Sequence, residues 1–247
     1  SHVFVLPGKP TPARLLGGLA TVKPFMFLTV PMVIEKIFKS KVFPATRSFP
    51  ANVLLKIPGL DRIVLNKIKK SLLTAFGNGF TTGLILGGAA LNREVEDLLK
   101  RMKFPYVVGY GMTECSPVIS NNLEWDNRKG SVGKLLPNCE AKIVDDEIWV
   151  RGSSVMMGYY KMPEETAETL VDGWLRTGDL GYIDEDNFVY ITGRKKNLII
   201  LANGENVSPE EIENEICKND LVKEIIVREK EKVIQAEIFP DYEYAKK

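Results

Sequence analysis

Short apolar runs recur along the first half of the chain, and polar or glycine-rich stretches separate them. The runs contain aliphatic, aromatic and β-branched residues and cover the segments 25–30, 84–86 and 106–108. Apolar runs of this length are typical of buried strands. The second run ends in Gly87-Gly88 and the third in Gly109-Tyr110-Gly111, as expected of parallel strands that lead into tight loops. We therefore expect a parallel sheet with glycine-rich loops at its carboxyl edge.

Between these runs the apolar residues follow a helical spacing. Residues 15–22 and 32–38 are expected to be helices, the second opened by Pro31, because proline suits a first helical turn. Two more helices are predicted, one over 63–76 and one that begins after an N-cap at Asn92. Their apolar faces consist of Ile63, Val64, Ile68, Leu72 and Phe76, and of Val95, Leu98, Leu99 and Met102. Strands that alternate with helices predict an α/β fold, which binds ligands at the carboxyl ends of its strands.

The pattern changes from about Gly130 onward, where short alternating segments replace the helices. Glycine and aspartate turns separate strands expected at 141–144, 147–151 and 188–192, which suggests a small barrel or sandwich. A charged stretch at 194–197 follows. After it we expect a hairpin (198–201 and 206–207), a helix that opens at Ser208 with Glu211 completing a capping box, and strands at 224–227 and 233–239.

Composition and charge exclude several classes of protein. The 247 residues are 45% apolar and 26% charged, which is typical of a globular protein. The net charge of +1 gives no strong field toward nucleic acid. A single histidine, His2, argues against Ser-His-Asp catalysis and histidine-rich metal sites. The three cysteines, Cys115, Cys139 and Cys217, fit neither a zinc cluster nor a disulfide framework, so we expect a reducing, cytoplasmic environment.

No membrane-spanning or targeting segment is expected from the sequence. The most apolar stretch, Pro24 to Ile34, is too short to cross a bilayer and contains Pro31.

Several side chains and glycines that could bind a nucleotide lie next to one another in the segment Gly109-Tyr110-Gly111-Met112-Thr113-Glu114. Its glycines allow a backbone to approach a ligand, and Tyr110 offers a flat face to a purine. Thr113 supplies a hydroxyl for phosphate, and Glu114 a hard oxygen for Mg²⁺. The same residues also fit a glycine turn that caps a strand, with Tyr110 in the core. Taken alone, this segment favours the turn.

Three further segments are candidates with structural alternatives. Asp179 can accept both hydroxyls of a vicinal diol such as a ribose, or it can be a turn aspartate that bonds its own backbone. Arg194 can contact phosphate or ribose oxygens, or belong to a solvated basic turn. Gly87-Gly88-Ala89 can line a base or simply form a corner. By contrast, Gly77-Asn78-Gly79 is interpreted as a turn, because a helical segment precedes it where a dinucleotide fingerprint requires a strand.

The order of these segments is more specific than any one of them. The chain resembles the acyl-adenylate-forming superfamily, which includes acyl-CoA synthetases, luciferases and the adenylation domains of peptide synthetases. The matching motifs are GGAAL, VGYGMTE, GSVGKLLPN, EIWVRGSSVMMGYY, GWLRTGDLGYID and ITGRKKNLIILANGENVSPEEIE, in the order that the family has them. TVPMVIEKIF and GRKKNLII are most similar to long-chain fatty acyl-CoA synthetases.

The resemblance implies a fold in three parts. Residues 1–129 would be the latter half of an α/β subdomain for acyl group and nucleotide, with a parallel-rich sheet. Residues 130–193 would form a small β-barrel subdomain. Residues 194–247 would contain the hinge, at Lys196, and the first part of a mobile α+β C-terminal lobe.

The resemblance also implies an activity and a set of site residues. An ATP-dependent, Mg²⁺-dependent ligase would first adenylate a fatty acid and release pyrophosphate, and coenzyme A would then displace AMP. Tyr110 would stack on adenine, and Gly87, Gly88 and Ala89 would line the base. Thr113 would contact phosphate, Glu114 would bind Mg²⁺, Asp179 the ribose, and Arg194 the nucleotide. Gly204 would approach the coenzyme A tunnel, and the acyl pocket would draw on Val30, Pro31, Gly109 and Gly133.

Two motifs of the family are missing from the sequence: the upstream Ser/Thr/Gly-rich phosphate loop and the C-terminal lysine motif. Nothing around Lys246 and Lys247 matches the latter. Many long-chain relatives also carry arginine where this chain has Met32. We therefore expect the 247 residues to be an inactive fragment that self-associates. Peripheral contact of the protein with a membrane is compatible with the sequence. Two alternatives stay open: an adenylating enzyme with another carboxylate or a carrier-protein acceptor, and a noncatalytic module that binds nucleotide or acyl chain.

Overall fold

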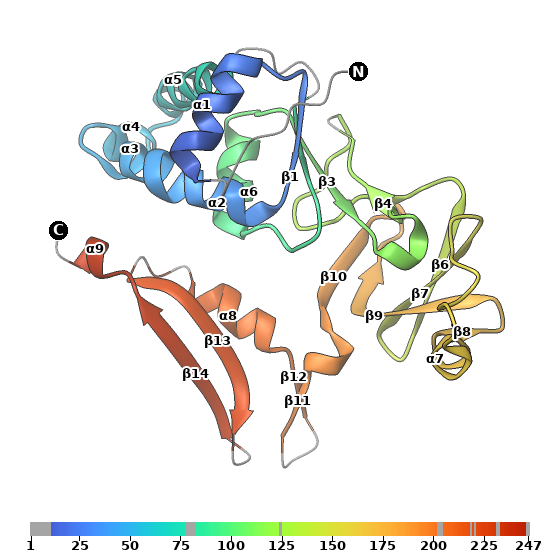
Figure 1. The fold of residues 1–247 in the computed structure, drawn as a ribbon. Helices are drawn as coiled ribbons and strands as arrows, with labels where there is room; N and C mark the ends of the chain where they lie inside the picture. Colours follow the sequence, from blue (N-terminus) through green and yellow to red (C-terminus); the bar gives the residue numbers. More distant parts are fainter. Residues whose placement is uncertain are drawn as a thin grey trace. The chain divides into compact units, whose positions relative to one another are not determined.

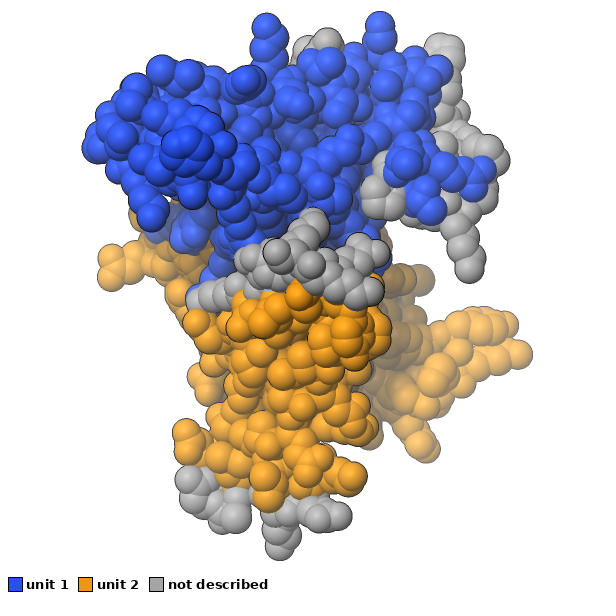
Figure 2. Space-filling view, turned by 90° about the vertical axis from the view of Figure 1, so that its left-hand side faces the viewer, with its two compact units in different colours: residues 1–110, 122–129 blue, residues 111–121, 130–247 orange. Residues whose placement is uncertain are grey.

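A computed structural model describes residues 11–77, 83–123, 125–201, 205–217, 219, 221–230 and 233–245. The chain divides into two compact units, which Figure 2 colours separately. Unit 1 consists of residues 1–110 and 122–129, and unit 2 of residues 111–121 and 130–247. The three-part division with boundaries after 129 and 193 stays a prediction.

Unit 1 is built from helices around three parallel strands (Figure 1). Strand β1 pairs with β2, and β2 pairs with β3, in parallel register throughout. The elements are α1 (Pro12–Val22), β1 (Met26–Thr29), α2 (Pro31–Ile37), the π-helical turn η1 (Phe38–Val42), α3 (Phe43–Arg47), α4 (Ala51–Leu54), α5 (Leu60–Ala75), β2 (Gly83–Leu86), α6 (Arg93–Arg101) and β3 (Tyr106–Tyr110). The predicted α/β organisation is confirmed.

The apolar spacing places part of the expected side chains in the core of unit 1. Two expectations are wrong: β1 is not a buried strand, because Met26 and Leu28 are exposed, and on α5 Ile63 is exposed whereas Leu65 is buried. Leu84 and Leu86 of β2 are buried, and the ring of Phe76 contacts those of Phe27 and Phe104. The predicted face of α6 is buried, and Asn92 caps this helix through Oδ1, which accepts hydrogen bonds from the backbone N–H groups of Glu94 and Val95. An asparagine cap of this kind stabilises a helix by about 1 kcal/mol.

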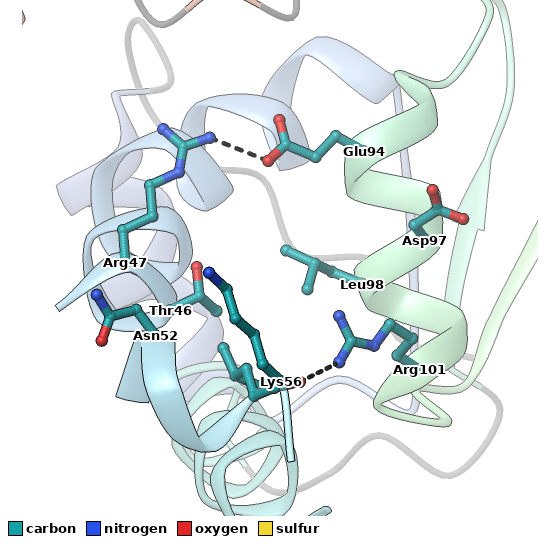
Figure 3. Close-up of a pocket in the computed structure, with 9 residues that line it drawn as sticks. Thr46, Arg47, Asn52, Lys56, Glu94, Asp97, Leu98 and Arg101 are labelled. Atoms are coloured by element: carbon teal, nitrogen blue, oxygen red, sulfur yellow. Dashed lines mark hydrogen bonds and ion pairs between the residues drawn. The ribbon is translucent and has the colours of Figure 1, made fainter. Parts of the chain in front are cut away.

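Unit 1 also has a surface cavity of about 560 Å³, which α3, α4 and α6 help to line (Figure 3). Arg47 pairs with Glu94 at 2.9 Å, and Arg101 donates a hydrogen bond to the Leu55 carbonyl at 3.2 Å. These contacts join α6 to the preceding helices. The cavity lies outside the residues that the sequence motifs single out.

Unit 2 contains an antiparallel sheet with strand order β10-β9-β7-β6, and β8 also pairs with β9. A short hairpin, a helix and a second hairpin with longer strands follow. The elements are η2 (Thr113–Cys115), β4 (Ser120–Asn121), β5 (Lys134–Leu135), β6 (Cys139–Val144), β7 (Glu147–Gly152), α7 (Pro163–Thr169), β8 (Leu170–Val171), β9 (Trp174–Ile183), β10 (Val189–Arg194), η3 (Lys195–Asn197), β11 (Ile199–Ile200), β12 (Asn206–Val207), α8 (Pro209–Ile216), β13 (Val222–Lys230), β14 (Val233–Pro240) and α9 (Tyr242–Ala245).

The strands and the helix predicted after Gly130 are confirmed, but the capping box at Ser208 is wrong. Ser208 precedes α8 without a side-chain cap bond. Its hydroxyl instead donates to the Thr192 carbonyl at 3.2 Å and lies 3.0 Å from the Glu210 carboxylate. A tertiary contact to β10 thus replaces the local contact that the S-x-x-E spacing predicts.

Cys115 is expected to react slowly with thiol reagents. Cys115 is the last residue of η2 and is fully buried, and burial is the main cause that raises the pKa of its thiol to about 11. Because the thiolate is the reactive form, labelling with a disulfide reagent at pH 8 should modify the half-buried Cys217 first and Cys115 only after unfolding. Mass spectrometry of peptides after timed labelling checks this order. Equal labelling rates in the folded protein would contradict it.

Candidate functional site

In unit 1 the predicted base-lining and acyl-pocket residues lie at the carboxyl ends of adjacent parallel strands. The Gly87 N–H donates to the Thr29 carbonyl at 3.3 Å, so the loop after β2 starts beside the end of β1. A Cβ added at Gly87 would lie 3.5 Å from the Gly109 carbonyl, and one at Gly88 would lie 3.9 Å from Val30 Cγ1. Segments from three separate parts of the sequence thus meet at one edge of the sheet.

The residues at this edge differ in exposure. Gly88 and Ala89 are exposed, Gly88 with a φ of +85° that favours glycine. Val30 is exposed, whereas the adjacent Pro31 is buried at the start of α2. Tyr110 ends β3 and exposes only 8% of its surface. Its stacking on adenine stays a prediction.

Gly111 has a role within the chain itself. A Cβ at this position would lie 1.8 Å from the Pro117 carbonyl oxygen, so any side chain would displace that backbone. The close approach explains the second glycine of the Gly109-Tyr110-Gly111 segment without a ligand. It also holds the turn that carries Thr113 and Glu114 against residues 117–118.

Unit 2 has a cleft of about 470 Å³ that three of the remaining predicted residues help to line. Glu114 comes from η2, Arg194 from the end of β10, and Lys196 from η3. The cleft is lined by Met112, Glu114, Glu147, Tyr159, Glu168, Thr169, Arg176, Thr177, Gly178, Arg194, Lys195 and Lys196. Carboxylates and cations thus line the same cleft.

Glu114 is held in place both at its carboxylate and at its backbone carbonyl. The Tyr159 hydroxyl donates to Glu114 Oε1 at 2.8 Å, and the Met156 N–H donates to the Glu114 carbonyl at 2.8 Å. The hydrogen bond to Glu114 needs the proton of the phenol, so it favours the protonated form and raises the pKa of Tyr159. Thr113, the neighbour of Glu114 on η2, is exposed. The sequence motif does not reveal Tyr159 as a partner, since 45 residues separate it from Glu114.

Asp179 and Arg194 form an ion pair across neighbouring strands. They are directly opposite in the register of β9 and β10, and Arg194 Nε lies 2.7 Å from Asp179 Oδ1. The Asp179 side chain is only 5% exposed, whereas that of Arg194 is 46% exposed. Asp179 lies within β9 and pairs with Arg194, whereas the structural alternative placed it in a turn, bonding its own backbone.

Glu147 is a site residue that the sequence analysis did not single out. Its side chain is 3% exposed, yet it is surrounded by donors. Glu147 Oε2 accepts from Lys195 Nζ at 2.9 Å, Oε1 accepts from the Gly178 N–H at 2.9 Å, and Arg176 Nε lies 3.8 Å away. An acidic residue in an otherwise apolar strand, Glu147-Ile148-Trp149-Val150, is the signal that marks it in the sequence.

The acid stability of the protein should depend on Glu147. Burial by itself raises the pKa of this carboxyl, but the hydrogen bonds from Lys195 and Gly178 outweigh burial and lower the pKa below 4.5. A group whose pKa is lower in the folded state stabilises the fold above its unfolded pKa and loses that effect as pH falls through the folded pKa. The stability difference between wild type and Glu147→Gln should therefore shrink below about pH 4.5. Chemical denaturation between pH 3 and 7 checks this, and a constant difference would contradict it.

The other predicted residues lie elsewhere or outside the described chain. Gly133 is buried, with a φ of +94°, and belongs to unit 2. Lys196 is exposed in η3, directly before β11, and its role as a hinge stays a prediction. Gly204 lies outside the described residues.

Metal binding in the described part of the chain would rely on ligands from substrate. In that part, no three His, Cys, Asp or Glu side chains are close enough to hold an ion by themselves. Mg²⁺ is often bound by one carboxylate together with substrate phosphates, and Glu114 offers one oriented carboxylate in the cleft. The donor set therefore fits Mg²⁺ that arrives with a nucleotide. In the described helices, none is long and apolar enough to cross a bilayer.

Comparison with known families gives one match that covers most of the chain. The sequence profile described as "AMP-binding enzyme" matches residues 1–160. Among curated proteins, a long-chain-fatty-acid–CoA ligase of Mycobacterium bovis is 32% identical over 239 residues, covering 87% of this chain and 39% of that protein. The peroxisomal long chain acyl-CoA synthetase 6 of Arabidopsis thaliana is 36% identical over 87% of this chain and 35% of its own length.

A relative with a different acid in its name is also similar. The 2-succinylbenzoate–CoA ligase of Listeria innocua is 40% identical over 86% of this chain and 45% of its own length. A solved structure of o-succinylbenzoate CoA synthetase from Bacillus subtilis, in complex with an acyl-adenylate, matches the fold with a TM-score of 0.71, at 24% identity, over 94% of this chain and 45% of that one. The chain thus spans less than half the length of these relatives.

Proposed function

Because the chain belongs to the AMP-binding enzyme family, we propose that the whole protein is an AMP-forming acid–thiol ligase that joins a long-chain fatty acid to coenzyme A. The observation that carries the proposal is the ion pair of the buried Asp179 with Arg194, because Arg194 lines the same cleft of unit 2 as the oriented Glu114. A nucleotide with its Mg²⁺ needs a buried acceptor for the ribose diol, a cation for the phosphates and a hard oxygen ligand for the metal ion.

The first half-reaction joins the acid to AMP. A carboxylate oxygen of the fatty acid bonds to the α-phosphorus of ATP, and the bond to the bridging oxygen breaks to release pyrophosphate. Asp179 accepts hydrogen bonds from the ribose hydroxyls, and Thr113 and Arg194 donate to phosphate oxygens. These contacts hold the α-phosphorus in line with the attacking oxygen, and positioning is the main source of catalysis in such a transfer. Mg²⁺ held at Glu114 would supply neutralisation of the phosphate charge.

The second half-reaction releases AMP. The thiol of coenzyme A attacks the acyl carbon, a C–S bond forms, and the C–O bond to AMP breaks. AMP is a good leaving group, which explains why a poor acyl donor such as a carboxylate is adenylated first. We assign Tyr110 to the adenine face, Gly87, Gly88 and Ala89 to the base edge, and Val30, Pro31, Gly109 and Gly133 to the acyl pocket. Lys196 would act as the hinge between the two steps and Gly204 would approach the thiol.

The proposal is tested on the whole protein with ATP, Mg²⁺, coenzyme A and a long-chain fatty acid. We expect pyrophosphate, AMP and acyl-CoA in equal amounts. Absence of acid-dependent pyrophosphate release would contradict the proposal. The same assay with 2-succinylbenzoate tests the second candidate, which the similarity to the Listeria ligase favours. Pyrophosphate release without consumption of free coenzyme A would instead indicate a carrier-protein acceptor.

The 247-residue chain by itself is proposed to bind nucleotide without turnover. Calorimetry with AMP and with a nonhydrolysable acyl-adenylate tests this, and measurable adenylation by the chain would contradict it. We further place the whole protein in the cytoplasm. The net charge of +1 of the 247 residues gives no strong field toward nucleic acid, and it is compatible with peripheral membrane contact.

Self-association of the 247-residue chain is expected from its first strand. β1 pairs with β2 on one side, no other strand of the described residues pairs with it, and its side chains Met26 and Leu28 are exposed next to Phe25. Unpaired apolar edges promote association. Light scattering at increasing concentration should show growing mass for the chain, and less growth for Leu28→Lys. A constant monomer mass would contradict the expectation.

A further inference from the structure

The strand that carries Asp179 is irregular at this residue. In the pairing of β7 with β9, Glu147 is opposite Leu180, and Trp149 is opposite Arg176. Two steps along β7 therefore correspond to four steps along β9, and residues 177–179 form a bulge. Bulges interrupt the backbone ladder and redirect side chains, and they are frequent next to active sites.

Side chains replace the ladder bonds that the bulge removes. Glu147 Oε1 accepts from the Gly178 N–H at 2.9 Å, and the Thr177 hydroxyl donates to the Ile148 carbonyl at 2.7 Å. The same hydroxyl accepts from the Asp179 N–H at 3.1 Å. Gly178 has a φ of +71°, a conformation that this bulge needs and that glycine tolerates. Each residue of the bulge thus takes part in a hydrogen bond to or from a side chain.

The second oxygen of Glu147 connects the bulge to the end of β10. Glu147 Oε2 accepts from Lys195 Nζ at 2.9 Å, while the preceding residue, Arg194, pairs with Asp179 at 2.7 Å. The consecutive cations Arg194 and Lys195 therefore bind the acids Asp179 and Glu147, respectively. Gly178 connects the two acids, because it precedes Asp179 in the chain and its N–H donates to Glu147. These contacts form one connected network. It contains Asp179, the proposed acceptor of the ribose hydroxyls, and it ends at Lys195, one residue before Lys196.

We propose that Glu147 is a positioning residue for the nucleotide: through Gly178 it holds the bulge that aims Asp179, and through Lys195 it anchors the segment that carries Arg194. The inference rests on the proposed function, since it takes Asp179 as the acceptor of the ribose hydroxyls. Glu147 itself touches no reacting atom. A buried carboxylate with two strong donors is costly to replace by an apolar side chain, because the donors would then lose their partner.

The test separates the two oxygens of Glu147 in the whole protein. Glu147→Met removes both acceptors, and Glu147→Gln keeps an acceptor for Gly178 but loses the charge that binds Lys195. We expect Glu147→Met to raise the KM for ATP about tenfold with kcat changed by less than about threefold, because misaligned ribose contacts weaken ground state and transition state alike. Glu147→Gln and Lys195→Met should raise the KM less.

A second pair of variants uses the hydroxyl of Thr177. Thr177→Val should raise the KM for ATP as Glu147→Met does, and Thr177→Ser, which keeps the hydroxyl, should restore it. The matched control is Glu140→Gln on β6, an exposed acid that forms an ion pair with the exposed Arg151 at 2.5 Å, and its kinetics should equal those of wild type. This pattern of KM changes and serine rescue is not expected from a loss of folded protein, which lowers the apparent kcat alone.

Two results would overturn the inference. One is a KM for ATP in Glu147→Met equal to that of wild type. The other is a loss of rate that follows the folded fraction, measured by thermal melting, with KM unchanged. If wild type releases no pyrophosphate with any acid, the proposed function fails instead, and AMP affinity from calorimetry decides about Glu147. A tenfold weaker affinity of Glu147→Met then supports the inference, and equal affinity, or no AMP binding by wild type, overturns it.

Discussion

Replacing Glu114 by glutamine is expected to slow acid-dependent pyrophosphate release by the whole protein about 100- to 1000-fold, as for other preorganised groups that stabilise transition-state charge. The substitution removes the charge that would hold Mg²⁺. It leaves an oxygen for the Tyr159 hydroxyl, which in the wild type donates to Glu114 Oε1 at 2.8 Å. The fold should therefore keep its melting temperature. Initial rates at several Mg²⁺ concentrations, beside a thermal melt, measure both quantities.

Two other variants show whether the loss belongs to the carboxylate. Tyr159→Phe removes the bond that orients Glu114 and should slow the reaction by a smaller factor, about three- to tenfold. Glu140→Gln removes an exposed carboxylate of the neighbouring sheet and should leave the rate unchanged. An unchanged rate in Glu114→Gln would remove this residue from the site.

Replacing Phe188 by alanine is expected to destabilise unit 2 by about 3–5 kcal/mol. The ring is 1% exposed, and Lys134 Nζ lies 4.8 Å from its centroid. Removing it would leave a cavity beside β10, the strand that carries Arg194. The backbone N–H of Phe188 donates to Asp184 Oδ1, a bond that alanine keeps, so the loss would report the ring. Denaturant titration of the whole protein measures the change.

A matched substitution at the surface should have almost no effect. Met157 is fully exposed, so Met157→Ala should change the stability by less than about 0.5 kcal/mol. Phe188→Leu, which fills most of the space, should lie between the two alanine variants. Equal stability of Phe188→Ala and Met157→Ala would contradict the assignment of Phe188 to the core.

The local order of the sequence was sufficient for most of the secondary structure. The apolar run 84–86 is the buried strand β2, and the helical spacing after Asn92 is α6, with its cap. These features depend on neighbours within about one helical turn, so their physical causes are visible in the sequence itself. Ser208 is the exception, because its hydroxyl finds a partner 16 residues away instead of the local cap.

The candidate site depends on both levels. Motif order singled out Glu114, Asp179 and Arg194, since their residue types and company resemble those of a known family. The pairing of Asp179 with Arg194 and the burial of both Asp179 and Glu147 were decided only by the tertiary structure. Glu147 and Lys195 are 48 residues apart, and they meet because β7 and β10 both flank β9. No local pattern specifies such a contact: strand neighbours follow from the packing of the whole sheet, which brings distant donors to a buried acid that cannot stay without them.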